Sequence, residues 1–188
     1  MAQRYAHAVG FDDAPFRRDH RGDVLVVGAV YARDRLDGVL STRVRRDGAN
    51  ATDRLVFCLA NSRFRVQLQL VLLQGIAFAG FNVVDIHRLH AASGLPVLVA
   101  ARRPPDFDAI RRALLEKVPG GARKWRLIQA AGPMEPVGGI HVQRAGLGSD
   151  AAAELVAEWQ IHSKLPEPLR AAHVIAGGVV TGESRHRA

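Results

Sequence analysis

The chain contains very little cysteine and no long hydrophobic run. Cys58 is the one cysteine among 188 residues, which excludes an internal disulfide and a cysteine-rich zinc site. No apolar run approaches the roughly 20 residues that a membrane-spanning helix needs. The first ten residues, MAQRYAHAVG, lack the apolar segment of a signal peptide. We therefore expect a cytoplasmic protein that does not associate with membranes.

Common catalytic motifs are also absent. The sequence contains no GxSxG, GxGxxG, HExxH or paired CxxC, the signatures of serine hydrolases, dinucleotide-binding enzymes, zinc proteases and cysteine zinc sites. Lysine is nearly absent too, with three residues, so that arginine carries most of the net charge of +8. The planar arginine fork suits phosphate, and a basic balance favours a polyanionic partner. The alternative is that arginine is merely the usual surface cation of this chain.

The pattern of strands predicts a single α/β domain over residues 1–188 with a mixed sheet. Three β-rich runs, at about 4–11, 24–32 and 39–45 with a turn at Asp37-Gly38, predict an antiparallel meander. The apolar runs VQLQLVLLQG and LPVLVAARRP predict a central parallel pair. Helices are expected at NATDRLVFCLANS, PDFDAIRRALLEK, SDAAAELVAEWQIHSK and EPLRAAHVIAGGVVTG, and weaker strands at RKWRLIQA and GIHVQRA. A ribonuclease H-like sheet flanked by helices is a strong candidate.

Two adjacent carboxylates, Asp12 and Asp13, end the first predicted strand in GFDDAPF. Carboxylates at the end of a strand suit Mg²⁺, which prefers oxygen ligands. Strand alternation directs only one of the two toward a shared ligand set, and Asp12 is the better candidate because it is nearer the strand. The alternative is a simple turn, since aspartate favours turns and Pro15 keeps Ala14 extended.

The segment QGIAFAGFNVVDIHRLH, residues 74–90, leaves the carboxyl end of a buried strand, which is where open α/β sheets place their sites. Asn82 and Asp85 then begin a helix, and helix capping is their alternative role. Near the chain end, Arg170 and His173 lie one helical turn apart and Arg185 is close to the terminus. These residues are candidates for contact with a substrate, whereas a histidine on an apolar stripe is usually a core residue.

Six segments together resemble one known family. GFDDAPF, LDGVL, RDGANATD, GIAFAGFNVVDI, PVLVAARRPPDF and PEPLRAAHVIAGGVVTGES occur in the order and spacing of the endonuclease dU family, over nearly the whole chain. The resemblance implies a ribonuclease H-like fold related to endonuclease V. It also implies metal-dependent cleavage of DNA that contains deoxyuridine, with DNA repair as the biological role.

The resemblance also assigns residues. Asp12 or Asp13 matches the first-strand metal ligand, and Asp85 with Asn82 lies in the loop after the fourth strand. Two positions depart from the pattern: Gln74 stands where endonuclease V has an aspartate, and Asn50 where the family has a second one. Because an amide is a poorer metal ligand than a carboxylate, the alternative is a protein that binds nucleic acid without cutting it.

The resulting hypothesis is a Mg²⁺- or Mn²⁺-dependent endonuclease. Its catalytic residues are Asp12, Asp13 and Asp85, with the metal held by Asp12 and Asp85. The partner is DNA, with RNA and a homodimer as further possibilities. Phe78 and Phe81 would stack on an extruded base, unless both belong to the core. The residues expected to contact the substrate are Gly80, Phe81, Asn82, Arg170, His173 and Arg185.

Overall fold

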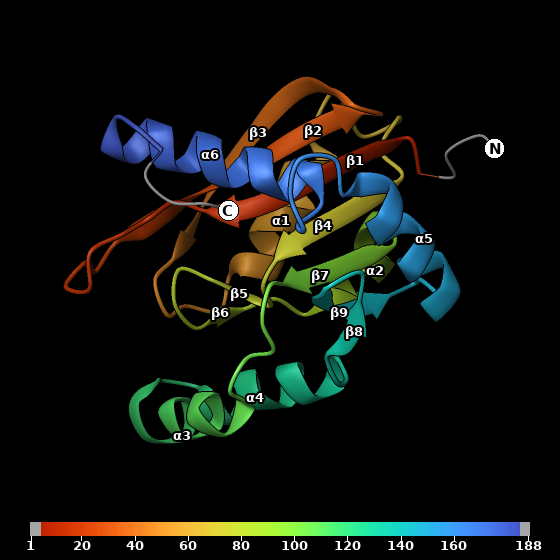
Figure 1. Cartoon of the computed structure of the whole chain (residues 1–188). Helices are drawn as coiled ribbons and strands as arrows, with labels where there is room; N and C mark the ends of the chain where they lie inside the picture. Colours follow the sequence, from red (N-terminus) through yellow and green to blue (C-terminus); the bar gives the residue numbers. More distant parts are fainter. Residues whose placement is uncertain (1–4, 185–188) are drawn as a thin grey trace.

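The protein, seen here in a computed structural model that describes residues 5–184, is built around a seven-stranded mixed sheet with helices on both faces (Figure 1). The strand order is β3-β2-β1-β4-β7-β9-β8. The strands are β1 (His7–Asp13), β2 (Asp23–Ala32), β3 (Arg35–Arg45), β4 (Leu70–Gln74), β7 (Val97–Ala101), β8 (Glu135–Val137) and β9 (Ile140–Ala145). Two short strands, β5 (Ala77–Phe78) and β6 (Asn82–Val83), form a separate antiparallel pair.

The predicted sheet is confirmed. β1, β2 and β3 form the antiparallel meander, and β1, β4 and β7 are mutually parallel neighbours. The fold is therefore the expected α/β class with a mixed sheet. Since the carboxyl ends of adjacent parallel strands meet at one edge of a sheet, the residues after β1, β4 and β7 are brought together.

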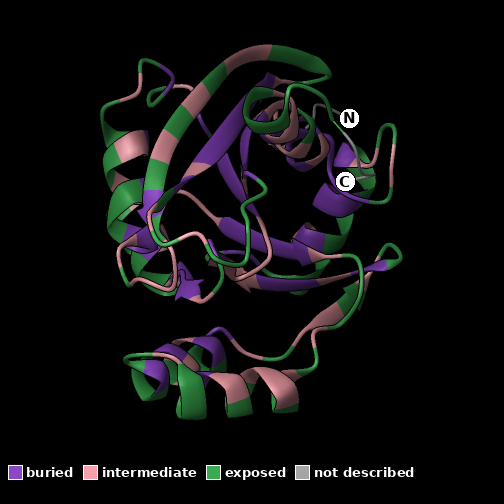
Figure 2. Cartoon of the chain, turned by 90° about the vertical axis from the view of Figure 1, so that its left-hand side faces the viewer, coloured by how far each residue is buried: buried purple, intermediate pink, exposed green. Residues whose placement is uncertain are grey.

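The central strands are apolar on both faces because both faces are covered. Val71 and Leu73 of β4 pack with α1 (Ala51–Ala60) and α2 (Ile86–Ser93), whereas Leu70 and Leu72 pack with α5 (Ser149–Trp159) and α6 (Glu167–Thr181). Figure 2 shows this buried layer through the middle of the molecule. The alternation of a strand therefore places successive apolar residues in two separate cores.

Two helices stand apart from these layers. α3 (Phe107–Lys117) and α4 (Gly121–Ala130) follow the carboxyl end of β7 and form a helical hairpin at the bottom of Figure 1. Leu114 and Ile128 bury the inner side of the hairpin against Val83 of β6. Across residues 5–184, no helix has both the length and the apolarity needed to cross a membrane.

Two local predictions were wrong. RKWRLIQA is helix α4 rather than a strand, since Lys124 and Ile128 recur at helical spacing on its buried side. The chain turns at Arg33 and Asp34, and Asp37-Gly38 lies inside β3. Gly38 is needed there because a Cβ would lie 2.3 Å from the Phe64 ring.

Candidate functional site

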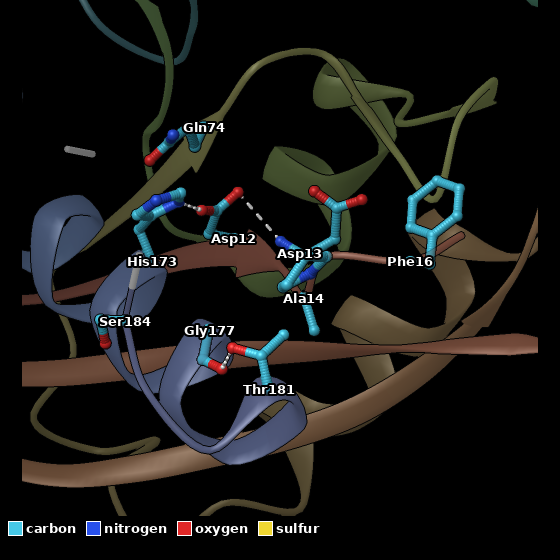
Figure 3. A pocket seen from close by; sticks show the side chains of 10 residues that line it. Asp12, Asp13, Ala14, Phe16, Gln74, His173, Gly177, Thr181 and Ser184 are labelled. Atoms are coloured by element: carbon cyan, nitrogen blue, oxygen red, sulfur yellow. Dashed lines mark hydrogen bonds and ion pairs between the residues drawn. The ribbon is translucent and has the colours of Figure 1, made fainter. Parts of the chain in front are cut away.

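A hollow of about 540 Å³ opens at the carboxyl ends of β1 and β4, beside α6 (Figure 3). It brings together the end of the first strand, the end of the fourth strand and the last helix. Its lining comprises Asp12, Asp13, Ala14, Pro15, Phe16, Gln74, His173, Gly177, Thr181 and Ser184. The sheet edge predicted from the sequence therefore carries a concave site in which polar side chains lie among apolar walls.

Asp12 and His173 are joined directly in this hollow. His173 Nδ1 donates to Asp12 Oδ2 at 2.8 Å, and Asp12 is 4% exposed. Burial raises the pKa of Asp12 above its ordinary value, while the hydrogen bond and charge of His173 act in the opposite direction. His173 is therefore not only a core residue, the alternative considered for it, because its side chain lines the hollow.

The approach of α6 to β1 depends on a glycine. A Cβ at Gly10 would lie 2.5 Å from the carbonyl carbon of Pro168, in the first turn of α6. A glycine inside a strand often marks such a close backbone approach. Gly10 therefore allows α6 to lie directly on β1, and this contact brings His173 to Asp12.

Asp13 is held at the same edge by the loop after β5. Its Oδ2 accepts a hydrogen bond from the Ala79 amide at 2.7 Å, and its own amide donates to Asp12 Oδ1 at 3.0 Å. Burial and the neighbouring charge of Asp12 raise the pKa of Asp13 to about 6. Two carboxylates on adjacent residues, one buried and one half-buried, favour a nearby cation or a bound proton that offsets their repulsion.

Gln74 is a third residue, after Asp12 and Asp13, whose side chain brings an oxygen atom to this hollow. Its side chain lines the hollow, and its Oε1 is buried with no hydrogen-bond partner in the part of the chain that the structure describes. A buried carbonyl oxygen without a partner costs about 1–3 kcal/mol, and a hard cation would satisfy it. Residues 5–184 contain no cluster of three His, Cys, Asp or Glu side chains suited to a metal. Among the side chains that line the hollow, the carboxylates of Asp12 and Asp13 and the amide oxygen of Gln74 are of the oxygen type that Mg²⁺ and Mn²⁺ prefer.

Asp85 does not join this group. It is the N-cap of α2, where Oδ1 accepts from the Arg88 amide at 3.0 Å, and its own amide donates to Thr52 Oγ1. It lines a different hollow, between α2 and the α3–α4 hairpin. The predicted grouping of Asp85 with Asp12 and Asp13 is thus not formed, because the chain runs through β5 and β6 before Asp85.

Asn82 and Asn50 support the fold beside the site. Asn82 is fully buried in β6, where Nδ2 donates to the Arg45 carbonyl and to Asn50 Oδ1, and its own Oδ1 accepts from the Ala51 amide. Each polar atom of the Asn82 amide is therefore engaged in joining β3, α1 and β6. The expected role of Asn82 in substrate contact is replaced here by a structural one.

Of the remaining predicted residues, Phe78, Gly80 and Arg170 are engaged in packing or pairing, and Phe81 lines another cavity. Phe78 is fully buried in the core, and Gly80, at positive φ, packs on Asp47. Arg170 forms two hydrogen bonds with Glu167 within α6. Phe81 is half-buried and lines a second, smaller cavity. Arg185 lies outside the described residues.

Three polar residues that line the hollow were not among the predicted site residues: Gln74, Thr181 and Ser184. Gln74 was marked as a departure from the family pattern rather than as a ligand. Thr181 donates to the Gly177 carbonyl, and Ser184 to the Val174 carbonyl, so both fold the end of α6 back on itself. The signal available in the sequence for Gln74 was its place immediately after an apolar strand.

Comparisons with known proteins agree with this architecture. The family model for endonuclease dU matches residues 4–180. A UPF0215 protein of Deinococcus radiodurans is 61% identical over 184 residues, covering 96% of this chain and 92% of the relative. A UPF0215 protein of Methanothermobacter thermautotrophicus is 46% identical over 181 residues, covering 94% and 89%.

Solved structures show the same fold. A protein of unknown function from Archaeoglobus fulgidus has a TM-score of 0.86 at 33% identity, covering 93% of this chain and 98% of that one. Endonuclease V of Ciona intestinalis, in complex with a 24-mer DNA containing inosine, has a TM-score of 0.57 at 14% identity, covering 90% and 83%. Endonuclease V of Bacillus subtilis has 0.60 at 11%, covering 94% and 81%. At such identities the similarity to endonuclease V concerns the fold.

Proposed function

Because the chain belongs to the endonuclease dU family, we propose that it is a metal-dependent endonuclease that nicks DNA containing deoxyuridine. The family and the endonuclease V fold support a nuclease that acts on DNA. One observation carries the metal dependence: the buried Asp12 and the half-buried Asp13 line the same hollow as Gln74, whose Oε1 has no partner within the described residues. Cleavage at deoxyuridine is the further step that we propose.

The residues of the hollow have distinct roles in this proposal. Asp12, Asp13 and Gln74 Oε1 would hold Mg²⁺ or Mn²⁺, which supplies a Lewis acid for the phosphate and lowers the pKa of bound water. His173 orients the Asp12 carboxylate through the bond from Nδ1. A bound divalent cation would also offset the charge of Asp12, which together with burial raises the pKa of Asp13 to about 6.

The nucleic-acid substrate is supported by the charge of the α3–α4 hairpin. Residues 102–126 contain eight Lys and Arg against three Asp and Glu, which is five of the net +8. The seven exposed cations are Arg102, Arg103, Arg111, Arg112, Lys117, Arg123 and Arg126. None of the ion pairs found within residues 5–184 involves these side chains. They are available for backbone phosphates.

The chain enters the hairpin from the sheet edge at which the hollow lies. The hairpin follows the carboxyl end of β7, and β7 is separated from β1 only by β4. Since neighbouring strands are about 4.8 Å apart, the segment 102–106 that leads to the hairpin begins roughly 10 Å along the sheet edge from the end of β1. A strand whose phosphate enters the hollow would therefore continue over this cationic surface.

A second candidate function is nucleic-acid binding without cleavage. The observation that favours it is Gln74, a neutral amide at the end of β4. Both functions predict binding to DNA that weakens as salt rises. Only the endonuclease predicts turnover that depends on a metal.

The test is nicking of a duplex with one deoxyuridine, in Mg²⁺, in Mn²⁺ and in EDTA, with the corresponding RNA as a second substrate. We expect nicking of the DNA that EDTA abolishes, and a large loss in Asp12→Ala, Asp13→Ala and Gln74→Leu. Asp150→Ala, an exposed residue in the first turn of α5, is the matched control. Full activity in all three variants would refute the site, and binding without metal-dependent nicking would establish the second candidate.

A further inference from the structure

A second cavity of about 220 Å³ begins one residue beyond the first hollow. Gly75 contributes to its lining, whereas Gln74 lines the hollow that holds Asp12. Its walls are mainly apolar and come from the β4–β5 loop, the end of β7 and the inner side of the α3–α4 hairpin. They include Ile76, Phe81, Ala101, Ile110 and Ile128. The two cavities therefore share the segment that leaves β4.

One polar side chain lines this apolar cavity. Gln143 of β9 is 1% exposed, and its Nε2 donates to the Gly132 carbonyl at 2.7 Å. Its Oε1 is buried and has no hydrogen-bond partner within residues 5–184. Because the Gly132 carbonyl can only accept, the amide must direct Nε2 toward it. The orientation of the amide is thereby determined, and an acceptor without a donor remains.

We propose that this cavity receives a uracil base extruded from the DNA strand, and that Gln143 Oε1 accepts the hydrogen bond from its N3–H. The inference rests on the proposed function, since a base inside a duplex reaches an interior cavity only by leaving the stack. Phe81 and the aliphatic walls then contact the flat ring, and Gln143 reads its edge. Gln143 is thus a specificity-determining residue.

The chemistry of the edge decides which base is selected. Uracil presents N3–H between two carbonyl groups, whereas cytosine presents a bare ring nitrogen at the same position. A carbonyl oxygen that faces a bare nitrogen gains no hydrogen bond and is repelled. Gln143 therefore favours uracil over cytosine but does not separate uracil from thymine, which carries the same N3–H.

The test measures binding in EDTA, so that cleavage is not required. Fluorescence anisotropy compares labelled single-stranded oligonucleotides that differ at one position: deoxyuridine, deoxycytidine or N3-methyldeoxyuridine. For the wild-type chain we expect deoxyuridine to bind about tenfold more tightly than the other two, the low end of the range for one unsatisfied buried acceptor. Gln143→Leu should remove the preference, because binding to the deoxyuridine strand weakens and the repulsion from the deoxycytidine ring nitrogen is lost.

Two further variants keep the result interpretable. Gln129→Leu, at an exposed position of α4, is the matched control and should retain the preference. Ala101→Phe fills the cavity without touching the Gln143 amide chemistry and should also remove the preference, with folding of each variant checked by thermal unfolding. Ala101→Phe thus tests the cavity even where Gln143→Leu fails to fold.

The outcomes separate this inference from the proposed function. Equal binding of deoxyuridine and deoxycytidine by the wild-type chain, or an unchanged preference in Gln143→Leu and Ala101→Phe, would overturn the base cavity. A preference for deoxyuridine that disappears in both variants supports it. If that preference appears but Mg²⁺ and Mn²⁺ produce no nicking, the cavity stands and the proposed catalysis falls.

Discussion

His173 Nδ1 lies 2.8 Å from Asp12 Oδ2, although 161 positions separate the two residues in the chain. The contact joins the last helix to the first strand, and it exists because α6 packs across β1 at Gly10. Asp12 is buried, so its carboxylate has few other partners. The orientation of Asp12 is therefore set by the last helix of the described chain.

Replacement of His173 should reduce nicking without abolishing the fold. We expect His173→Ala to lower kcat/KM on deoxyuridine DNA by about 10- to 100-fold, the range for residues that orient a metal ligand. Because His173 acts through Asp12, the concentration of Mn²⁺ needed for half-maximal activity should rise as well. His87→Ala, an exposed residue on α2, should change neither quantity; an unaltered Mn²⁺ requirement in His173→Ala would contradict the positioning role.

Gly10→Ala should destabilise the protein and displace α6. The added Cβ would meet the Pro168 carbonyl at 2.5 Å, and overpacking of this kind costs about 1–3 kcal/mol. Activity should fall with stability because the Asp12–His173 contact depends on the same approach. The control is Gly178→Ala, inside α6, where the added Cβ would meet only Ser184 Oγ at 3.6 Å. This variant should be more stable than the wild-type chain by about 0.5–1 kcal/mol. Urea denaturation distinguishes the two, and equal stability of both variants would contradict the account.

Neutralising the α3–α4 hairpin should weaken binding to DNA in a way that depends on salt. Arg111→Gln with Arg112→Gln removes two exposed cations, and each lost phosphate contact should reduce the slope of log K against log salt by about 0.9. The control is Arg63→Gln with Arg65→Gln, in the segment before β4 at the opposite edge of the sheet. Titrations at several salt concentrations measure the slopes; the same slope in both double variants would exclude the hairpin from the DNA path.

The first turn of α6 should make stability depend on acid pH. Burial alone would raise the pKa of Glu167, but the hydrogen bonds from Arg170 and His162 outweigh it and hold the pKa below its ordinary value of 4.5. A lowered pKa stabilises the fold above about pH 4.5, and this stabilisation is lost as the pH falls through the pKa of the folded state.

Glu167→Gln should remove that pH-dependent loss and destabilise the protein at neutral pH by about 1–3 kcal/mol, because Arg170 loses its charged partner. Urea denaturation between pH 7 and pH 3 measures both effects. Glu154→Gln, an exposed residue on α5, should leave the pH profile unchanged. A profile in Glu167→Gln identical to that of the wild-type chain would show that the pair does not contribute.

The sequence by itself determined the sheet and the principal acidic pair. The β-rich composition of the first three strands and the uninterrupted apolar runs of β4 and β7 are local patterns. They sufficed for the meander, the parallel pair and the place of Asp12 and Asp13 at a strand end. The family resemblance came from ordered motifs along the whole chain, which also require no knowledge of the packing.

Only the tertiary structure decided which side chains meet. Asp85 looked like a ligand but caps α2, whereas His173 of α6 bonds to Asp12 and Gln74 of β4 lines the same hollow. Gln143 carried no local signal, since its unpartnered oxygen exists only where β9, the end of β7 and the α3–α4 hairpin enclose a cavity. The periodicity of a sequence shows on which face of a helix or strand a residue lies. Whether side chains from distant segments meet depends on tertiary contacts, and these form only when the sheet edge, the hairpin and the last helix pack together.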